Sequence, residues 1–252
     1  MINELLENII YEYSYFTLFG ITLAYFLVLY LGLAPLFDAT CRFLASKGLL
    51  EKIAAKEVPR KQIKYEIRHS LQSVFLFGFT GIPIVWGIRE GVIHILPNTA
   101  LNVLLGLVLL TAWNELHFFL VHRLMHLPWW MRNVHYIHHR SHVPTVYSIY
   151  SFHWLEAALL STVPLTFALL FPLAPMAVFL YPLISVLLNY AGHCNYRFGK
   201  GTGPDWLVFG THHAEHHHKG RQNFGFASHL PDWLYRKLSG HRPYPNNPKK
   251  NE

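Results

Sequence analysis

Hydrophobic residues fall into four long blocks that alternate with polar segments. The first three blocks cover residues 15–37, 71–87 and 100–119, and the fourth covers residues 155–190. A helix needs about 20 predominantly apolar residues to cross a bilayer, so each of the first three blocks predicts one membrane-spanning helix. The fourth block is long enough for two helices, and the proline-containing stretch at 171–175 predicts a turn inside it. We therefore expect a membrane hairpin there.

This pattern predicts an all-α integral membrane protein, a helical bundle with about four or five transmembrane segments. The composition agrees, because only 14% of the residues are charged, whereas soluble domains carry about 25%. The polar segment at 47–70 predicts a surface helix, a proline break and a second short helix.

Lysine and arginine collect in three polar segments of the chain, which cover residues 38–70, 121–153 and 191–252. Positive charge accumulates in cytoplasmic loops, and five spans with an outside N-terminus place all three segments in the cytoplasm. The net charge of +7 is therefore explained by membrane topology, and no nucleic-acid partner is expected. The membrane is the inner or plasma membrane if the host is bacterial, and the endoplasmic reticulum if it is eukaryotic.

Histidines concentrate in the second half of the chain. The sequence has 18, and all but His69 and His94 come after residue 116. HRLMH and NYAGH each place two polar side chains four residues apart, whereas HYIHH and HAEHH each place three histidines at i, i+3 and i+4. Both spacings bring side chains to one face of a helix. The four motifs contribute His122 and His126; Asn189 and His193; His135, His138 and His139; and His213, His216 and His217.

Nine imidazoles near one face of a membrane indicate metal binding. Polar side chains are costly at the edge of a bilayer, and imidazole is a suitable ligand for iron, copper, zinc or nickel. A single zinc ion takes three or four protein ligands, so nine histidines predict two metal ions with four or five nitrogens each. We expect this centre in a histidine-rich cap on the cytoplasmic side of the bundle.

The motifs HRLMH, HYIHH and HAEHH resemble the three histidine boxes of the fatty acid hydroxylase and sterol desaturase superfamily of membrane di-iron oxygenases. Three smaller features support the resemblance: Glu115 before the first box, HWLE at 153–156 where the family often has HPxE, and a closing segment at 222–240. The closing segment has Asp232-Trp233 where the family has the reverse order.

The resemblance implies three regions. Residues 1–69 form an N-terminal membrane span with a basic cytoplasmic connector. Residues 70–242 form the catalytic domain, and residues 243–252 form a polar C-terminal tail.

The resemblance also implies a ligand set. Two iron ions, for which zinc is a possible substitute, are bound by the nine histidines of the four motifs, which form the catalytic centre, together with Asn189, and O2 is the co-substrate. Asn189 stands where relatives carry His or Asn, and it would bind through a water. Other residues are candidates for orienting the ligands through hydrogen bonds: Glu115, His142, His153, Glu156, His212, Glu215 and His218.

The implied reaction is hydrogen abstraction from an unactivated C–H bond of a lipid, such as a fatty acyl chain or a sterol, with hydroxylation or desaturation as the outcome. The substrate arrives from the membrane. Electrons come from a partner such as a cytochrome b5-like protein or a ferredoxin with its reductase. Five basic residues form a candidate docking surface for an acidic donor, although positive charge that fixes the topology is the better explanation for each of them taken singly: Arg123, Arg132, Arg140, Lys219 and Arg221.

Two other interpretations remain open from the sequence. One is a zinc-dependent membrane hydrolase, which needs a carboxylate base near the metal, and only Glu115, Glu156 and Glu215 are available. The other is a non-enzymatic metal-binding or haem-binding membrane protein, which would place histidines inside the spans. The apolar blocks are nearly free of histidine, which disfavours this second alternative.

Overall fold

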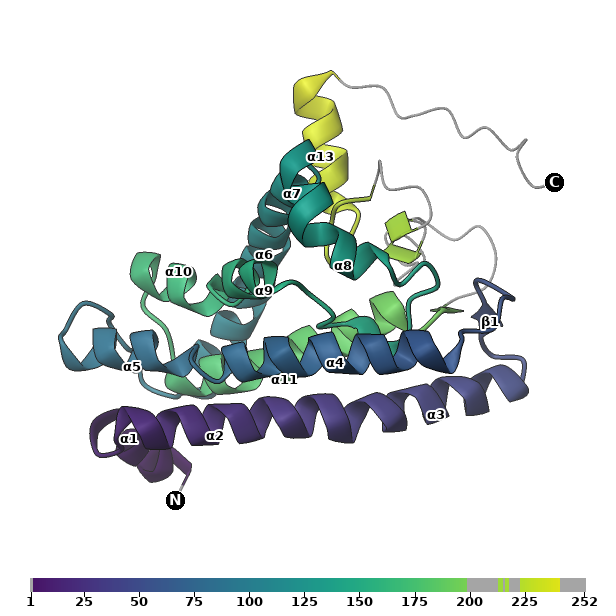
Figure 1. Cartoon of the computed structure of the whole chain (residues 1–252). Helices are drawn as coiled ribbons and strands as arrows, with labels where there is room; N and C mark the ends of the chain where they lie inside the picture. Colours follow the sequence, from purple (N-terminus) through teal and green to yellow (C-terminus); the bar gives the residue numbers. More distant parts are fainter. Residues whose placement is uncertain (1, 199–212, 215, 218–222, 241–252) are drawn as a thin grey trace.

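The computed structural model describes residues 2–198, 213, 214, 216, 217 and 223–240, and Figure 1 shows that it is a helical assembly. The longest unit is a continuous rod over Tyr15–Ser46, which consists of α2 (Tyr15–Leu27), a π-helical turn η1 (Val28–Gly32) and α3 (Leu33–Ser46). Ser14 caps the start of the rod by accepting a hydrogen bond from the backbone N–H of Thr17, as serine commonly does at this position. The π-turn lies where the Tyr190 hydroxyl donates to the Leu29 carbonyl.

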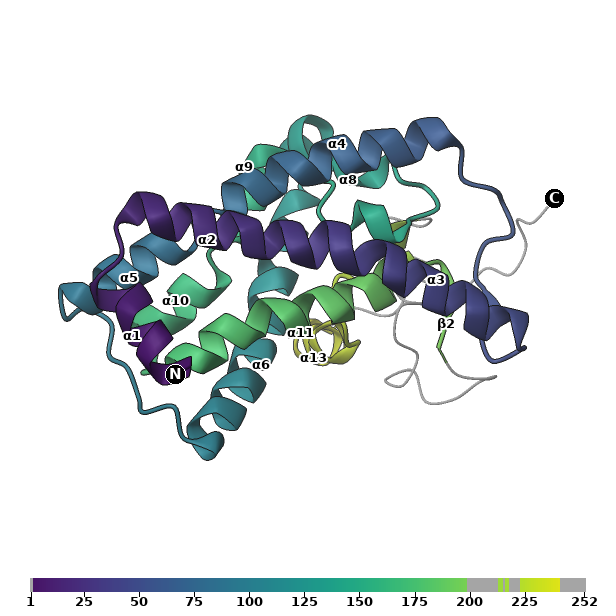
Figure 2. The same ribbon diagram turned by 90° about the horizontal axis from the view of Figure 1, so that it is seen from below.

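Two helices return antiparallel to this rod, α4 (Arg60–Phe77) and α5 (Gly81–Arg89). Figures 1 and 2 show α4 on one side of the rod and α11 (Pro175–His193) on another. A short first helix, α1 (Ile2–Tyr11), packs at the far end against α5. Arg89 at the end of α5 holds it there, because its guanidinium donates to the carbonyls of Ile10 and Tyr13.

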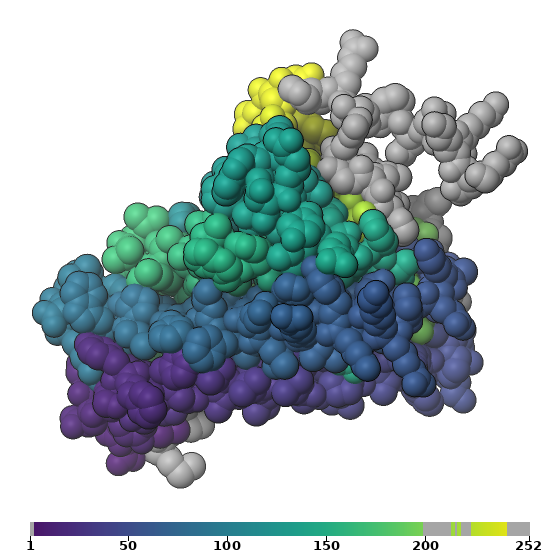
Figure 3. All heavy atoms as spheres, viewed as in Figure 1, coloured from purple at the N-terminus to yellow at the C-terminus, as the bar shows by residue number. Residues whose placement is uncertain are grey.

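Helix α6 (Ala100–Met125) leaves the layer formed by the other long helices. It packs closely on α11 at Gly106, where a Cβ atom would lie 2.7 Å from the Cβ of Ala177, so a side chain does not fit at this crossing. Figure 3 shows the teal segment that follows α6 and the yellow C-terminal helix rising from the slab made by the N-terminal helices. This rising part includes the HRLMH and HYIHH motifs.

Four helical units of the described residues are long and apolar enough to cross a membrane: Tyr15–Ser46, Arg60–Arg89, Ala100–Met125 and Pro175–His193. Their outer faces carry large apolar side chains, among them Phe16, Leu101, Leu104 and Val108. An exposed apolar surface of this extent is stable against lipid and not against water. The predicted helical membrane bundle is therefore confirmed.

The expected hairpin contains one spanning helix and a shorter helical pair. Its second arm is α11, and its first arm is divided into α9 (Trp154–Leu160) and α10 (Val163–Leu170). The hydroxyls of Ser161 and Thr162 donate to the carbonyls of Ala158 and Leu159, which ends α9. The turn between the arms pairs with the loop before α6, since Leu173 exchanges backbone hydrogen bonds with that loop.

Three polar segments meet at one end of the bundle, as the predicted topology requires. The connector strand β1 (Glu51–Lys52) pairs antiparallel with β2 (Tyr196–Arg197), which directly follows α11. Farther along the connector, Gln62 donates to the carbonyl of Val143, in the segment after HYIHH. The histidine motifs therefore lie at the same end of the bundle as the basic connector.

The prediction of a helix in the first part of residues 47–70 is wrong. This stretch contains a turn and β1, and helix begins only at Arg60, after Pro59. The backbone of Ala54 pairs with the side chain of Asn195, which donates to its carbonyl and accepts from its N–H. Pairing with a distant segment has overcome the local helical preference. From Arg60 the helix runs directly into the second apolar block.

Candidate metal centre

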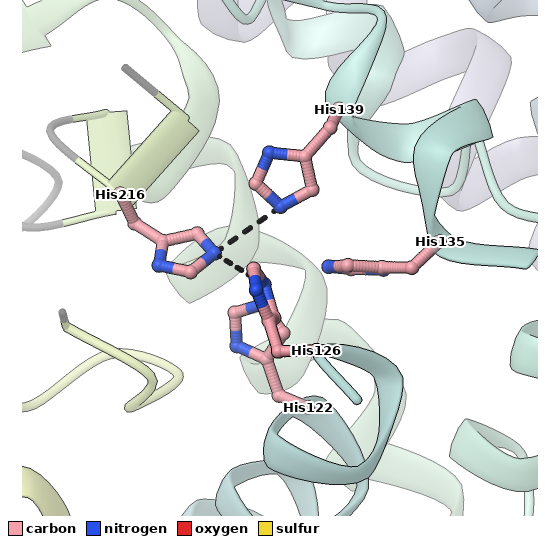
Figure 4. Close-up of side chains that lie close together, drawn as sticks. All are labelled: His122, His126, His135, His139 and His216. Carbon is pink, nitrogen blue, oxygen red and sulfur yellow. Dashed lines mark hydrogen bonds between the residues drawn. The ribbon is translucent and has the colours of Figure 1, made fainter. Parts of the chain in front are cut away.

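Five histidines form the first group, and their ring nitrogens lie within 4.8 Å of one another. Helix α6 contributes His122 near its end and His126 as its C-cap, one turn later. Pro128 then starts a short turn of helix, α7 (Pro128–Trp130), which passes through a π-helical turn, η2 (Met131–His135), into α8 (Tyr136–His139). Figure 4 shows His135 and His139 from these turns facing His122, His126 and His216.

Four histidines form the second group, again with ring nitrogens within 4.8 Å of one another: His138, His193, His213 and His217. The ring of His138 lies 5.5 Å from that of His135, measured between centroids, so the groups are adjacent. The two HxxHH motifs each serve both groups. HYIHH gives its first and last histidine to the first group, whereas HAEHH gives its first and last histidine to the second.

The nitrogen spacing fits a metal ion in each group. In the first group, Nε2 of His216 lies 3.0 Å from Nε2 of His126 and 3.2 Å from Nε2 of His139 (Figure 4). In the second, Nε2 of His213 lies 3.1 Å from Nε2 of His193 and 3.3 Å from Nε2 of His217. Imidazole nitrogens about 2.1 Å from one shared ion lie roughly 3.0–3.4 Å apart.

Hydrogen bonds on the other ring nitrogen orient three of these histidines. Nδ1 of His122 donates to the carbonyl of Phe224 at 3.0 Å, and Nδ1 of His193 donates to the carbonyl of Asn189 at 3.0 Å. Nδ1 of His135 lies 2.8 Å from the carboxylate of Glu156. A proton fixed on Nδ1 leaves Nε2 with its lone pair for a metal.

Two of these Nε2 atoms lack any other partner. Nε2 of His122 and Nε2 of His135 are buried and make no hydrogen bond with the described residues. Buried nitrogens are normally hydrogen-bonded, and a metal ion in the first group would satisfy both. The residues present therefore fit the predicted metal.

The histidines outside the spans are held in the neutral form. Burial and the neighbouring imidazoles lower the pKa of His135, His138, His213 and His217 well below its ordinary value, and that of His139 to about 2. Desolvation disfavours the charged imidazolium. Only a neutral imidazole has a lone pair for a metal, so the cluster provides ligands without first losing protons.

The residues expected to orient the ligands through hydrogen bonds do not all contact a histidine. Glu156 is buried and holds His135. Glu115 accepts hydrogen bonds from the N–H of Ala227 and the hydroxyl of Ser228, so it holds the closing segment instead of a histidine. His153 caps α9 by accepting from the N–H of Leu155.

His142 is exposed, and its electrostatic effect adds to burial in lowering the pKa of His139. The amide of Asn189 donates to the carbonyl of Ile149, and its role as a ligand stays a prediction. The remaining candidates, His212, Glu215 and His218, lie outside the described residues, as do Lys219 and Arg221.

The closing segment forms a support beneath the first group. Asp232, at the start of α13 (Leu230–Ser239), accepts hydrogen bonds from the N–H groups of Phe224 and Gly225 at 3.1 and 2.8 Å. The same Phe224 supplies the carbonyl that orients His122. The guanidinium of Arg123 lies over the ring of Tyr235 from α13, 3.8 Å from its centroid. Arg123, a candidate docking residue from the sequence, therefore also packs the closing segment on α6.

Sequence reasoning missed one buried carboxylate. Glu66 on α4 accepts hydrogen bonds from Gln62 and Thr145, and it anchors the segment that follows HYIHH, including the short helix η3 (Val146–Ser148). A polar pair at i, i+4 is common on exposed helix surfaces, so the spacing of Gln62 and Glu66 carries no sign of burial.

An apolar cavity of about 240 Å³ lies inside the bundle, and two of its aromatic lining residues contact histidine rings of the metal centre. Phe118, Phe152, Asn189 and Phe226 line it near the metal centre, and the ring of Phe118 lies 5.0 Å from that of His122. At the other end it reaches side chains of α1. None of the described residues that line it is charged, so its interior is suited to an apolar molecule.

Comparison with known proteins agrees with this site. The model of the family described as "Fatty acid hydroxylase" matches residues 107–237, just over half of the chain, and this range includes all nine histidines of the two groups. No curated protein and no solved structure matches the chain. The family match and the histidine-rich helical bundle lead to one conclusion: the chain belongs to the fatty acid hydroxylase family.

Proposed function

We propose that the protein is a membrane-bound di-iron monooxygenase that hydroxylates or desaturates a C–H bond of a lipid. One observation carries this proposal: two adjacent groups of buried histidines adjoin an uncharged cavity inside a membrane bundle. The family consists of hydroxylase and desaturase enzymes, which supports an oxidative reaction.

Iron supplies what no side chain can, the activation of O2 for attack on an unactivated C–H bond. In hydroxylation, one oxygen atom enters the product and the other leaves as water, with two electrons from an external donor and two protons from the solvent. The nine histidines of the two groups would hold the iron through their ring nitrogens. Glu156 and the carbonyl of Phe224 fix the rings of His135 and His122 in the orientation that this binding needs.

The apolar cavity also provides a route for the substrate that excludes water. Phe118, Phe152 and Phe226 cover the end of the cavity next to the histidines, so a lipid chain lying there would exclude water from the reacting carbon. Exclusion of water limits side reactions of the activated oxygen. A substrate that enters from the membrane needs no aqueous route to this position.

We place the metal centre on the cytoplasmic side, where a cytochrome b5-like protein or a ferredoxin with its reductase would deliver electrons. The basic connector, paired with the segment after α11 at the histidine end, supports this orientation, because positive charge favours the cytoplasmic side. Arg132 is a candidate contact for an acidic donor. Arg123 and Arg140 already lie over the rings of Tyr235 and Tyr65.

The carboxylates argue against a zinc-dependent hydrolase. Such an enzyme needs a carboxylate that activates a metal-bound water. Glu156 is engaged with His135, and Glu115 with the closing segment, while Glu215 lies outside the described residues. We therefore favour oxidative chemistry over hydrolysis.

The proposal is tested by metal analysis and lipid profiling of the full-length protein. We expect about two irons per chain, and, in cells that express the protein under ¹⁸O2, a lipid that gains one labelled oxygen. His138→Ala and His216→Ala should lose bound iron and product together. His94→Ala is the matched control, since His94 is exposed and lies outside both groups.

Two results would overturn the proposal. One is a full iron content in the His138→Ala, His216→Ala double variant. The other is a wild-type protein that retains zinc after expression with excess iron and forms no oxidised lipid. Desaturation is recognised by a product that loses two hydrogens and gains no labelled oxygen.

A further inference from the structure

One side chain in the cavity has an unused polar group. Asn114 on α6 is 5% exposed and lines the cavity. Its amide nitrogen makes no hydrogen bond within the part of the chain that the structure describes. A buried amide without a partner is unfavourable, and it is retained at little cost only if another molecule satisfies it.

Three other polar side chains of the cavity already donate to backbone carbonyls of the protein. The hydroxyls of Thr80 and Ser161 donate to the carbonyls of Phe77 and Ala158, and the amide of Asn189 donates to the carbonyl of Ile149. Asn114 differs from these residues because its donor remains available. The cavity therefore contains an amide donor that the described part of the protein leaves without a partner.

The position of this donor relative to the metal centre follows from the helix. Asn114 precedes Phe118 by four residues and His122 by eight, and all three belong to α6. Residues four and eight apart share a helix face, and eight residues rise roughly 12 Å along the axis. Phe118 lies between, lining the same cavity and contacting the His122 ring.

The lining also defines the charge of the group that Asn114 can bind. No described residue of the cavity is Lys, Arg, His, Asp or Glu. A carboxylate or phosphate would lose its hydration there without gaining a cation, whereas a neutral hydroxyl or carbonyl oxygen needs only one donor. The cavity thus favours a neutral oxygen function over the ionised head group of a free fatty acid.

We propose that Asn114 is a specificity-determining residue that donates a hydrogen bond to a neutral oxygen, hydroxyl or carbonyl, of the lipid substrate. This inference rests on the proposed oxidation of a lipid at the histidine centre. The substrate is then an elongated apolar molecule with an oxygen function roughly 12 Å along the helix axis from the histidines. A neutral alcohol, ketone or ester has this chemistry, and a plain hydrocarbon does not.

The test measures binding, so it does not depend on turnover. The full-length protein in lipid nanodiscs is equilibrated with two radiolabelled probes of equal chain length, a long-chain primary alcohol and the corresponding alkane. We expect the wild type to prefer the alcohol by roughly tenfold, the value of one buried hydrogen bond. Asn114→Leu, which keeps a similar size and removes the amide, should abolish this preference and leave binding of the alkane unchanged.

Two further variants complete the design. Ile84→Val trims an apolar side chain of the same cavity and should change the binding of both probes equally. Asn114→Gln keeps an amide and should recover part of the preference. A wild type without preference for the alcohol, or an Asn114→Leu variant that retains it, would overturn the proposal.

Iron content and the thermal midpoint of unfolding, measured on the same samples, separate misfolding from loss of selectivity. If Asn114→Leu does not fold, Asn114→Ala provides the same comparison. A wild type that prefers the alcohol but forms no oxidised product from any lipid would contradict the proposed function and leave the binding result intact.

Discussion

The carboxylate of Glu156 lies 2.8 Å from Nδ1 of His135, and both side chains are buried. Glu156 comes from α9 and His135 from the π-turn before α8, so this contact joins two elements at the first histidine group. It also fixes which nitrogen of His135 faces that group. A carboxylate that orients a metal-binding histidine strengthens metal binding without touching the metal.

We therefore expect Glu156→Leu to weaken iron binding by about 10- to 100-fold. Equilibrium dialysis against a graded chelator measures the change. Glu156→Gln keeps an oxygen that accepts a hydrogen bond from Nδ1 of His135, so its iron affinity should fall less. Unchanged iron affinity in Glu156→Leu would show that the contact serves packing alone.

Asp232 supports the first histidine group through the closing segment. Its carboxylate accepts from two backbone N–H groups, and the segment it holds carries the carbonyl that orients His122. Hydrogen bonds to a charged group contribute about 1.5–3 kcal/mol each, so Asp232→Ala should lower the thermal midpoint clearly and reduce iron content.

The control for Asp232 is Asp38→Ala. Asp38 forms an i, i+4 pair with Arg42, whose side chain is largely exposed, and such pairs contribute less than about 1 kcal/mol. Equal losses of stability in the two variants would contradict the supporting role of Asp232.

The sequence predicted the spanning helices and the nine clustered histidines because both depend on local periodicity. A membrane-spanning helix is recognised from the length of an apolar block alone. Histidines at i and i+4 necessarily share a helix face. The assignment of His138 to one group and His139 to the other could not be predicted. Neighbouring residues diverge by about 100° on a helix, and only the surrounding helices decide which metal group each ring meets.

The two carboxylates illustrate the same limit of prediction from local sequence patterns. Glu115 and Glu156 were equivalent candidates in the sequence, yet one holds the backbone of Ala227 and the other holds His135. Their partners are 112 and 21 residues away, and no local pattern encodes such separations. The missing helix in the connector has a similar cause, because Ala54 pairs with Asn195 across 141 residues.

Gly225 in the closing segment should not tolerate a side chain. A Cβ atom there would lie 2.2 Å from the carbonyl oxygen of Ser228, so Gly225→Ala must move the backbone that Asp232 holds. We expect a loss of about 1–3 kcal/mol in stability, the usual cost of overpacking, together with lower iron content. Gly20→Ala is the matched control, since a Cβ added there would meet no atom within 4 Å apart from its own helix backbone and chain neighbours, and it should leave both quantities unchanged or slightly raise stability.

Arg89 holds the helix that lines one end of the cavity. Its guanidinium donates to the carbonyl of Ile10 at 2.6 Å and to that of Tyr13 at 2.7 Å, and it lies over the ring of Tyr15. These contacts hold α1, which supplies Leu6 and Ile10 to the cavity wall. Arg89→Ala should therefore release α1 and speed proteolytic cleavage near Tyr13, while iron content stays normal because the histidines lie at the other end.

Arg89→Lys separates geometry from charge in this contact. A lysine keeps the positive charge but lacks the planar fork that reaches two carbonyls at once, so we expect it to restore only part of the protection. Full protection in Arg89→Lys would mean that charge alone holds α1. Protection in Arg89→Ala would mean that apolar packing against α5 suffices to hold α1, and that the guanidinium contacts are not needed.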